Sequence, residues 1–353
     1  MCPAAHRTRC KTRHCEPVTD VTGVAIRIPH PTFHERSFPM DNRVICVVGP
    51  TATGKTKMGV ALAKRFGGEV VSVDSMQIYR GMTIGTAAPT AEETEGIPHH
   101  MVAVADPAES WSVARFTEQA DRCIQDILCR GRRPVLVGGT GLYLDSILSG
   151  RTFAAGHSGG EVRRALQMEL AQGGIEPLYR QLQAIDPTAA ARLHLSDEKR
   201  ILRALEVFRE TGETITAHDA RTRLRPPKYR AYTIGLTFRD RADLYERIDC
   251  RVDTMVAQGL LQEVEALLKS GLPETATALQ AIGYKQFLSV YRGDTPARDA
   301  VAEVKLRSRQ YAKRQLTWLR RKEDIHWILW EKTPDFPAGL QNATEYLLAQ
   351  GLG

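Results

Sequence analysis

Short apolar runs alternate with amphipathic segments in the first part of the chain. The run Val44–Val48 is followed by a glycine-rich turn and then by a helical pattern over Lys57–Phe66. Two further runs of the buried-strand type lie within Glu69–Tyr79 and Arg133–Leu142. Continuous apolar runs of this kind are typical of parallel strands that are covered on both faces. The pattern therefore predicts an α/β fold with a parallel sheet and helices on both faces.

Residues 151–225 interrupt this alternation with helical periodicity and show no strand of convincing length. The predicted helices are Glu161–Ala171, Ile175–Ala184, Thr188–Leu193 and Asp197–Thr211. Seventy-five residues are too many for a bare loop. We therefore expect an inserted all-helical subdomain.

The pattern divides the chain into five segments. They are an N-terminal extension (1–39), an α/β core (40–150), the helical insertion (151–225), a return to the core with basic helices (226–332), and a C-terminal tail or helix (333–353). The extension shows no period and we expect it to be disordered, with Met40 as the natural start. A metal site in the extension and a transit peptide are weaker alternatives.

A complete phosphate-binding loop of the form G-x-x-x-x-G-K-[ST] follows the first apolar run. Its residues are Gly49, Pro50, Thr51, Ala52, Thr53, Gly54, Lys55 and Thr56. In such a loop the backbone N–H groups and the helix N-terminus face the phosphates, the lysine adds a positive charge, and the threonine hydroxyl binds Mg²⁺. The motif predicts a P-loop NTPase-like sheet, a bound diphosphate or triphosphate, and Thr56 as a ligand of Mg²⁺.

The loop alone does not establish phosphoryl transfer. The later strand candidate, Arg133–Leu142, ends in Gly138, Gly139 and Thr140 and lacks the metal-holding aspartate of a typical kinase. Asp74 instead follows the run after Glu69, and parallel strands bring their carboxyl ends to one edge of the sheet. We expect Asp74 near the phosphates as a general base, with a helix cap or an indirect metal ligand as the alternative.

Basic charge is concentrated outside the segment that carries the phosphate loop. Residues 40–150 contain 11 Lys and Arg against 12 Asp and Glu, whereas residues 151–325 contain 30 against 23. The stretch Lys305–Lys322 has eight basic residues and no acidic one. This distribution favours a nucleic-acid partner.

Within that stretch, Lys305, Arg309 and Lys313 recur at helical spacing, with Tyr311 and Trp318 among them. We expect a helix that follows an RNA backbone, with a solvated helix that binds nothing as the alternative. Trp318 fits the core face of such a helix, so base stacking is not assigned to it.

Composition sets outer limits on the class of protein. The chain has 353 residues, 42% hydrophobic content and a mean hydropathy of −0.29, and it contains no apolar run long enough to cross a membrane. Seven cysteines without a secretory segment favour reduced thiols. We expect a cytoplasmic monomer without a membrane partner, although the sequence leaves the oligomeric state open.

Several segments together are far more specific than the loop alone. They read GPTATGKT, SVDSMQIYRGMTIGTA, PHH (Pro98–His100), LVGGTGLY, DEKRILRALEVF, AIGYKQ and KRQLTWLR. On these segments the chain resembles the tRNA dimethylallyltransferases, also called tRNA isopentenyltransferases, over about 42–330. No cysteine follows Cys250, so the sequence lacks the Cys/His finger that some eukaryotic relatives have after this region. The bacterial type of enzyme is therefore favoured.

The resemblance implies a reaction. The family transfers a five-carbon dimethylallyl group from dimethylallyl diphosphate to N6 of the adenosine 3′ of a tRNA anticodon. By this resemblance Asp74 is the base, Thr51 contacts the reacting groups, and Arg251 is a further cation for the diphosphate. Arg251 follows Arg247 by one helical turn, and a solvated pair of arginines is the ordinary alternative.

The resemblance also implies contacts with the tRNA anticodon stem-loop. The matching positions are Asp74, Ser75, Met76, Gln77, Thr140, Arg163, Lys199, Arg200, Ile201, Leu202, Arg203, Gln280, Ala281, Ile282, Gly283, Tyr284, Lys285, Lys313, Arg314, Gln315 and Arg320. For Ile201 and Leu202, a place in a helical core is compatible with this implication.

Two other functions use the same features. A small-metabolite or nucleotide kinase would use Asp74 as the base for a hydroxyl, but it leaves the basic stretch unexplained. A noncatalytic RNA-binding module would tolerate Asp74→Asn. The segments that carry the resemblance disfavour both.

Overall fold

The computed structural model describes residues 41–150, 160–224 and 226–352. The expectation of a disordered extension over 1–39 lies outside the described residues. No described helix has both the length and the apolar character needed to cross a membrane.

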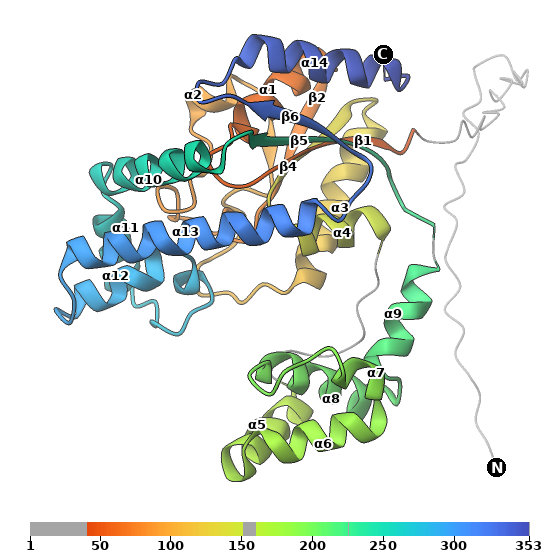
Figure 1. Ribbon diagram of the computed structural model, residues 1–353, viewed down its shortest axis with the longest axis vertical. Helices are drawn as coiled ribbons and strands as arrows, with labels where there is room; N and C mark the ends of the chain where they lie inside the picture. Colours follow the sequence, from red (N-terminus) through yellow and green to blue (C-terminus); the bar gives the residue numbers. More distant parts are fainter. Residues whose placement is uncertain (1–40, 151–159, 225, 353) are drawn as a thin grey trace, which may run out of the picture. The chain divides into compact units, whose positions relative to one another are not determined.

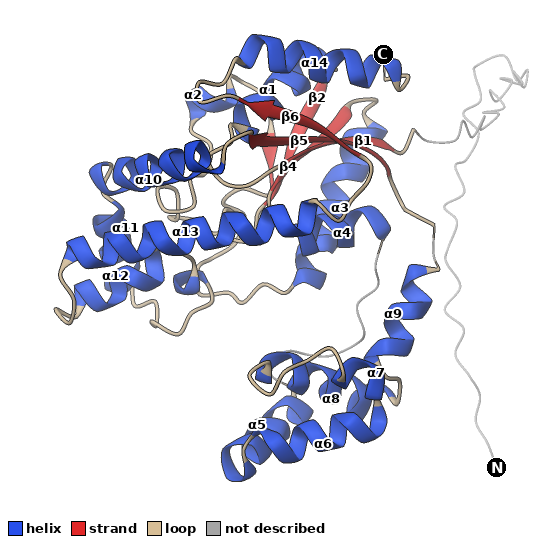
Figure 2. Cartoon of the chain, viewed as in Figure 1, coloured by secondary structure: helices blue, strands red, loops and turns tan. Residues whose placement is uncertain are grey.

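The described residues form one sheet of six parallel strands in the order β3-β2-β4-β1-β5-β6 (Figure 2). The strands are β1 (Arg43–Val48), β2 (Gly68–Val73), β3 (His99–His100), β4 (Arg133–Gly138), β5 (Arg230–Phe238) and β6 (Ile325–Trp330). The middle strands are buried almost throughout, as expected of a sheet that helices cover on both sides.

The helices are distributed between the core and the insertion (Figure 1). Those of the core are α1 (Lys55–Arg65), α2 (Ala91–Thr94), α3 (Val113–Cys129), α4 (Gly141–Ser149), α10 (Arg241–Ala257), α11 (Leu260–Lys269), η1 (Ala278–Gln280), α12 (Tyr284–Tyr291), α13 (Ala297–Leu319) and α14 (Phe336–Ala349). Those of the insertion are α5 (Glu161–Gly173), α6 (Ile175–Ile185), α7 (Pro187–Ala190), α8 (Glu198–Thr211) and α9 (Ile215–Arg223).

Alternate residues of β1 point into two hydrophobic cores, one on each face of the sheet. Val44 and Cys46 belong to the core that α3, α4, α11 and α12 cover. Ile45 and Val47 belong to the core that α1 and α14 cover. Successive side chains of a strand point to opposite faces, so one apolar run serves both cores. This arrangement confirms the predicted α/β fold with helices on both faces.

The register of the sheet brings three loops to one edge. Val48 at the end of β1 is the partner of Gly138 at the end of β4, and Gly138 is in turn the partner of Val73 at the end of β2. The residues after these positions are the phosphate loop, the turn at Asp74, and Gly139 with Thr140. This common edge is where a ligand of such a sheet is expected to bind.

The described part of the insertion is helical and has a core of its own. Leu166, Leu178, Leu182 and Leu205 are at most 1% exposed and pack together with neighbours from α5, α6, α7 and α8. Asp186 caps α7 through the N–H of Ala189 (3.0 Å). A local core of this kind explains how the segment forms without extending the sheet.

Two helices of the insertion differ from the sequence prediction. The predicted helix Thr188–Leu193 is only one turn long and begins at Pro187, because Asp186 and Pro187 form a cap and a first turn. Helix α9 (Ile215–Arg223) was not predicted, since its polar sequence has little apolar period. Its start is nevertheless marked by Thr214, whose hydroxyl accepts from the N–H of Ala217 (3.2 Å).

Candidate active site

The phosphate loop links β1 to α1 through two conformations that favour glycine. Gly54 has φ +84° and precedes the first helical residue, Lys55. Gly49 has φ +151°, and a Cβ there would lie 2.3 Å from the carbonyl oxygen of Leu236 on β5. A larger residue at position 49 would therefore collide with the next strand. These local requirements explain the loop's sequence.

Helix α1 presents an open N-terminus to this edge of the sheet. Its first turn has no acidic residue, and no side chain of the described residues caps it. The N–H groups of a first helical turn lack partners within the helix and favour an anion. Among the described residues the hydroxyl of Thr56 makes no hydrogen bond, so it is available to a metal ion.

The ammonium group of Lys55 lies inside this loop and donates to the carbonyl of Pro50 (2.7 Å). Burial lowers its pKa to about 7, and the positive charge of Arg251 acts in the same direction, while Asp74 partly opposes the change. A pKa near 7 indicates that the surrounding protein groups do not fully compensate the positive charge of this buried lysine. An anion bound in the loop would restore the charged lysine.

Diphosphate binding should therefore be accompanied by proton uptake. With its pKa near 7, the Lys55 amine is mostly neutral at about pH 8, and a bound anion raises the pKa so that a proton is taken from the buffer. Calorimetry in two buffers of different ionisation enthalpy measures this uptake. In Lys55→Arg the side chain stays charged and the uptake should disappear. Equal uptake in the two proteins would contradict the assignment to Lys55.

Asp74 directly follows β2 and is held by its own turn. Its Oδ1 accepts hydrogen bonds from the backbone N–H groups of Met76 (2.8 Å) and Gln77 (3.3 Å). No described residue bonds to Oδ2. One carboxylate oxygen thus fixes the side chain, and the other remains able to accept a proton.

Arg251 on α10 completes a cluster with Lys55 and Asp74. The charge of Asp74 affects the pKa of both cations, and Arg251 affects that of Lys55. The buried Nε of Arg251 has no hydrogen-bond partner among the described residues, and burial lowers the pKa of its guanidinium. An unpaired buried donor beside a second cation is expected where an anion binds.

Arg247, one turn earlier on α10, is an exposed residue with a different contact. Its Nε donates weakly to the carbonyl of Ala52 (3.4 Å), and its guanidinium lies 5.5 Å from the centroid of the Phe238 ring. The phosphate loop is held from a further side by Trp330, whose indole donates to the carbonyl of Thr53 (3.0 Å). Elements from the second half of the chain thus support the loop.

The third loop of the edge carries Thr140, the residue before α4. Its buried hydroxyl has no hydrogen-bond partner in the described part of the chain and lies beside Tyr311 on α13. The charge of Asp74 contributes to the raised pKa of Tyr311 and of Tyr143, although burial is the larger cause for both. Asp74 is therefore near enough to both tyrosines for its charge to act on them.

The loop after Asp74 depends on Glu263, a residue that sequence reasoning missed. Its carboxylate accepts from the N–H groups of Thr83 (2.8 Å), Ile84 (2.9 Å) and Gly85 (3.1 Å), and from the hydroxyl of Tyr284 (2.5 Å). Nothing in the amphipathic pattern of α11 distinguishes this glutamate from a solvated one.

The same loop uses the side chain of Gln77. Its amide donates to the carbonyls of Thr86 (3.2 Å) and Ala87 (3.0 Å) and accepts from the hydroxyl of Ser72 (2.8 Å). Ser75 and Met76 beside it are partly exposed.

Apart from those in the loops described above, the positions matched to tRNA contacts fall into three groups by exposure. Six have buried side chains or backbone, namely Ile201, Leu202, Ala281, Gly283, Tyr284 and Gln315. The fully exposed ones are Lys199, Arg200, Gln280, Lys285, Lys313, Arg314 and Arg320, and Arg163, Arg203 and Ile282 are partly exposed. Arg203 lies 2.9 Å and Arg163 3.9 Å from the buried carboxylate of Glu206.

The basic face of α13 is only partly free. Lys305 pairs with Asp253 (2.7 Å), and Arg309 pairs with Asp249 (2.6 Å), both on the adjacent α10. These two cations are therefore paired within the protein, and the contact of this helix with an RNA backbone stays a prediction. Lys313 is exposed.

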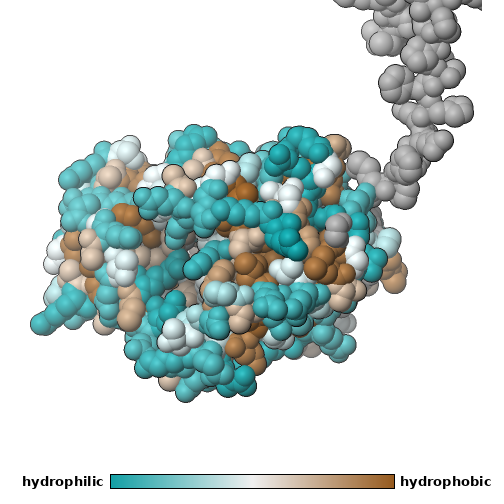
Figure 3. All heavy atoms as spheres, turned by 90° about the horizontal axis from the view of Figure 1, so that it is seen from above, coloured by the Kyte–Doolittle hydropathy of each residue, from teal (hydrophilic) through white to brown (hydrophobic). Residues whose placement is uncertain are grey.

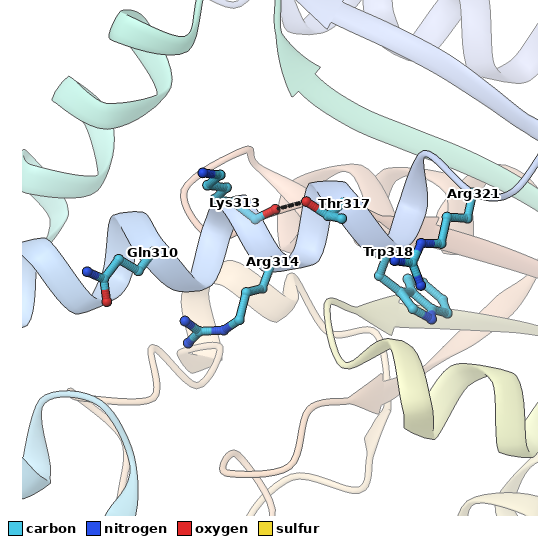
Figure 4. A pocket seen from close by; sticks show the side chains of 6 residues that line it. All are labelled: Gln310, Lys313, Arg314, Thr317, Trp318 and Arg321. Atoms are coloured by element: carbon cyan, nitrogen blue, oxygen red, sulfur yellow. Dashed lines mark hydrogen bonds between the residues drawn. The ribbon is translucent and has the colours of Figure 1, made fainter. Parts of the chain in front are cut away.

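Toward its C-terminal end α13 borders a groove of about 420 Å³. The lining residues are Gln310, Lys313, Arg314, Thr317, Trp318 and Arg321 (Figure 4). One side of the Trp318 indole packs on Gly141, where a Cβ would lie 2.3 Å from the ring. The groove thus combines three cations with an aromatic ring.

Figure 3 shows one face of the molecule coloured by hydropathy. Hydrophilic residues predominate on this face, and hydrophobic ones are scattered among them.

The described residues contain no group of three or more His, Cys, Asp or Glu side chains arranged to hold a metal ion. His100 bonds to the carboxylate of Glu69 (2.7 Å), and His99 bonds to the carbonyl of Ile97 (2.9 Å). Glu69 also pairs with Arg130, and the hydrogen bonds from Arg130 and His100 lower the pKa of its carboxyl to about 2, although burial acts in the opposite direction. Both histidines thus have contacts within the protein.

Sequence comparisons identify relatives over most of the chain. The family profile described as IPP transferase matches residues 77–322, and one described as isopentenyl transferase matches residues 42–103. A tRNA dimethylallyltransferase of Acetivibrio thermocellus is 42% identical over 89% of this chain and 99% of its own length. One of Geobacter metallireducens is 45% identical over 81% of this chain and 92% of its own.

Solved structures agree with this result. A tRNA isopentenylpyrophosphate transferase of Bacillus halodurans has 40% identity and a TM-score of 0.65, with 88% of this chain and 97% of that chain covered. A eukaryotic dimethylallyltransferase acting on tRNA has 30% identity and a TM-score of 0.74, with 88% and 78% covered. Together with the loops at the carboxyl edge of the sheet, these matches show that the chain belongs to the tRNA dimethylallyltransferase family, as its sequence motifs predicted.

Proposed function

We propose that this protein transfers a dimethylallyl group from dimethylallyl diphosphate to N6 of the adenosine 3′ of a tRNA anticodon. The observation that supports the proposal best is the cluster of Asp74, Lys55 and Arg251 beside an open helix N-terminus. A base and two cations for an anion are what this reaction needs. The family membership supplies the substrate class.

The bonds change in one displacement. The N6 amine forms a bond to C1 of the dimethylallyl group, and the bond from C1 to the diphosphate oxygen breaks with its electron pair on the diphosphate. An exocyclic amine is a weak nucleophile, so its proton must be accepted as the new bond forms. The free Oδ2 of Asp74 accepts this proton, while Oδ1 stays bonded to the N–H groups of Met76 and Gln77.

The phosphate loop holds the leaving group. Its backbone amides, the ammonium of Lys55 and the guanidinium of Arg251 act on the negative charge that develops on the diphosphate. Thr51 lies in the same loop and would contact the reacting groups. Since both cations have pKa values lowered by burial, they are stabilised by an anion more than by solvent.

The donor set fits Mg²⁺ bound jointly by protein and substrate. Thr56 offers a hydroxyl without a hydrogen bond, and the described residues have no cage of carboxylates, so the remaining ligands would be diphosphate oxygens and water. When bound, Mg²⁺ would neutralise part of the charge of the leaving diphosphate.

RNA would be held by exposed cations of the insertion and of α13. Lys199 and Arg200 are exposed on α8, and Lys313, Arg314 and Arg321 line the groove of α13. Cations on a groove that also holds an aromatic ring suit the sugar-phosphate backbone of a single-stranded loop. The target base must leave its stack to reach Asp74.

Transfer of labelled dimethylallyl to anticodon stem-loops tests the proposal. The stem-loops carry either adenosine or guanosine 3′ of the anticodon. We expect label only in the adenosine RNA, and EDTA should prevent this labelling because it withdraws Mg²⁺. ATP consumption without RNA labelling would instead favour a kinase.

A further inference from the structure

Gln315 is a buried glutamine of α13 that reaches two loops of the site at once. Its Oε1 accepts from the backbone N–H of Thr51 in the phosphate loop (3.2 Å). Its Nε2 donates to the carbonyl of Gly139, next to Thr140 (3.0 Å). The side chain is 7% exposed, so both bonds form away from bulk solvent.

The two partners allow only one orientation of the amide. The N–H of Thr51 can only donate, and the carbonyl of Gly139 can only accept, so the oxygen of Gln315 must face the phosphate loop. The contact is tight, because a Cβ on Gly139 would lie 2.1 Å from Nε2 of Gln315. Residue 139 must therefore be glycine for the amide to fit between the loops.

The bridged loops carry different halves of the proposed reaction. Thr51 lies on the diphosphate side, and Thr140 lies on the side of the target nucleotide. Tyr311, one turn before Gln315 on α13, lies beside both Thr140 and Gln315. One helix thus sets the distance between the two loops.

We propose, on the basis of the function proposed above, that Gln315 is a positioning residue that fixes the phosphate loop relative to the Thr140 loop. The resemblance implies a contact between Gln315 and tRNA, but both ends of its amide are used within the protein. Its effect is then on the alignment of two bound substrates. Small misalignments of reacting atoms have large effects on rate.

Gln315→Met removes both bonds with little change in volume. We expect kcat for dimethylallyl transfer to fall by roughly 10- to 100-fold, while KM for each substrate stays within about threefold. Gln341→Met on the exposed face of α14 is the matched control and should leave both constants unchanged. A higher KM for tRNA with unchanged kcat would overturn the proposal in favour of a direct RNA contact.

Gln315→Glu provides a readout that a general loss of packing would not change. A protonated carboxyl can accept from Thr51 and donate to Gly139 as the amide does, whereas a carboxylate cannot donate. Burial raises the pKa of such a carboxyl, so the activity relative to wild type should increase as the pH falls from about 8 to about 5. The neighbouring charged side chains Asp74, Lys55, Arg251 and Arg314 are present in both proteins, so their own contribution to the pH profile is common to the two. Tyr311 stays neutral in this range, because burial raises its pKa. A ratio that is constant with pH would overturn the proposal.

Hydrogen exchange separates this inference from the proposed function. The N–H of Thr51 should exchange faster in Gln315→Met than in wild type, whether or not the wild type transfers dimethylallyl. Absence of transfer in the wild type with faster exchange would overturn only the proposed function. Transfer in the wild type with unchanged exchange would overturn only the role of Gln315.

Discussion

Asp74→Asn should lower kcat for dimethylallyl transfer by about 10²- to 10⁴-fold, the usual effect of removing a general base. The asparagine oxygen can still accept from the N–H groups of Met76 and Gln77, so the turn after β2 is preserved. Its NH₂ group replaces the free Oδ2 and cannot accept a proton. The expected defect is therefore chemical, and the KM values for both substrates should stay within a few fold.

Asp106→Asn is the matched control. Asp106 forms a similar turn, with its Oδ1 accepting from the N–H of Ala108 (2.9 Å), but it is exposed and belongs to another loop. Its substitution should leave the kinetic constants unchanged. Single-turnover kinetics with preformed complexes isolate the chemical step. If Asp74→Asn loses less than threefold in that step, Asp74 is not the base.

Arg251→Met should lower kcat by about 10²- to 10³-fold, because a preorganised donor to the leaving group is lost. The guanidinium has a buried Nε without a partner among the described residues and a pKa lowered by burial. Its removal should therefore leave the melting temperature unchanged or raise it, as is common at functional sites. Thermal unfolding without ligand, measured together with the kinetics, tests whether kcat falls while the melting temperature stays the same or rises.

The same substitution should raise the pKa of Lys55, since the charge of Arg251 lowers it. Proton uptake on diphosphate binding near pH 8 should then be smaller than in wild type. Arg241→Met, at the exposed first position of the same helix, is the control and should change neither quantity. A destabilised Arg251→Met with normal transfer would show that Arg251 is structural.

The parts of the site that the sequence predicted are those that local geometry or register determines. The phosphate loop needs glycine at positions 49 and 54, where φ is positive, so the sequence motif is enough to predict the conformation of the loop. Asp74 could be located because parallel strands end at one edge of a sheet. Arg251, by contrast, came only from the resemblance, since a pair of arginines one turn apart is compatible with a solvated helix face.

The parts that the sequence did not predict depend on partners distant in the chain. Lys305 and Arg309 are paired because Asp253 and Asp249 lie on a second helix, and periodicity in α13 contains no information about α10. Likewise, nothing in the sequence distinguishes Gln315 and Glu263 from other polar residues, because the loops they bond to are distant in the chain. Strands β5 and β6 were not located either, because a single apolar run does not show which sheet it joins.

The most direct test of the central claim is nucleoside analysis of full-length tRNA after incubation with wild-type protein, dimethylallyl diphosphate and Mg²⁺. The proposed function predicts that the adenosine 3′ of the anticodon gains one C₅H₈ unit on N6, with one diphosphate released for each group transferred. Unmodified adenosine, or a phosphorylated product formed from ATP, would contradict it.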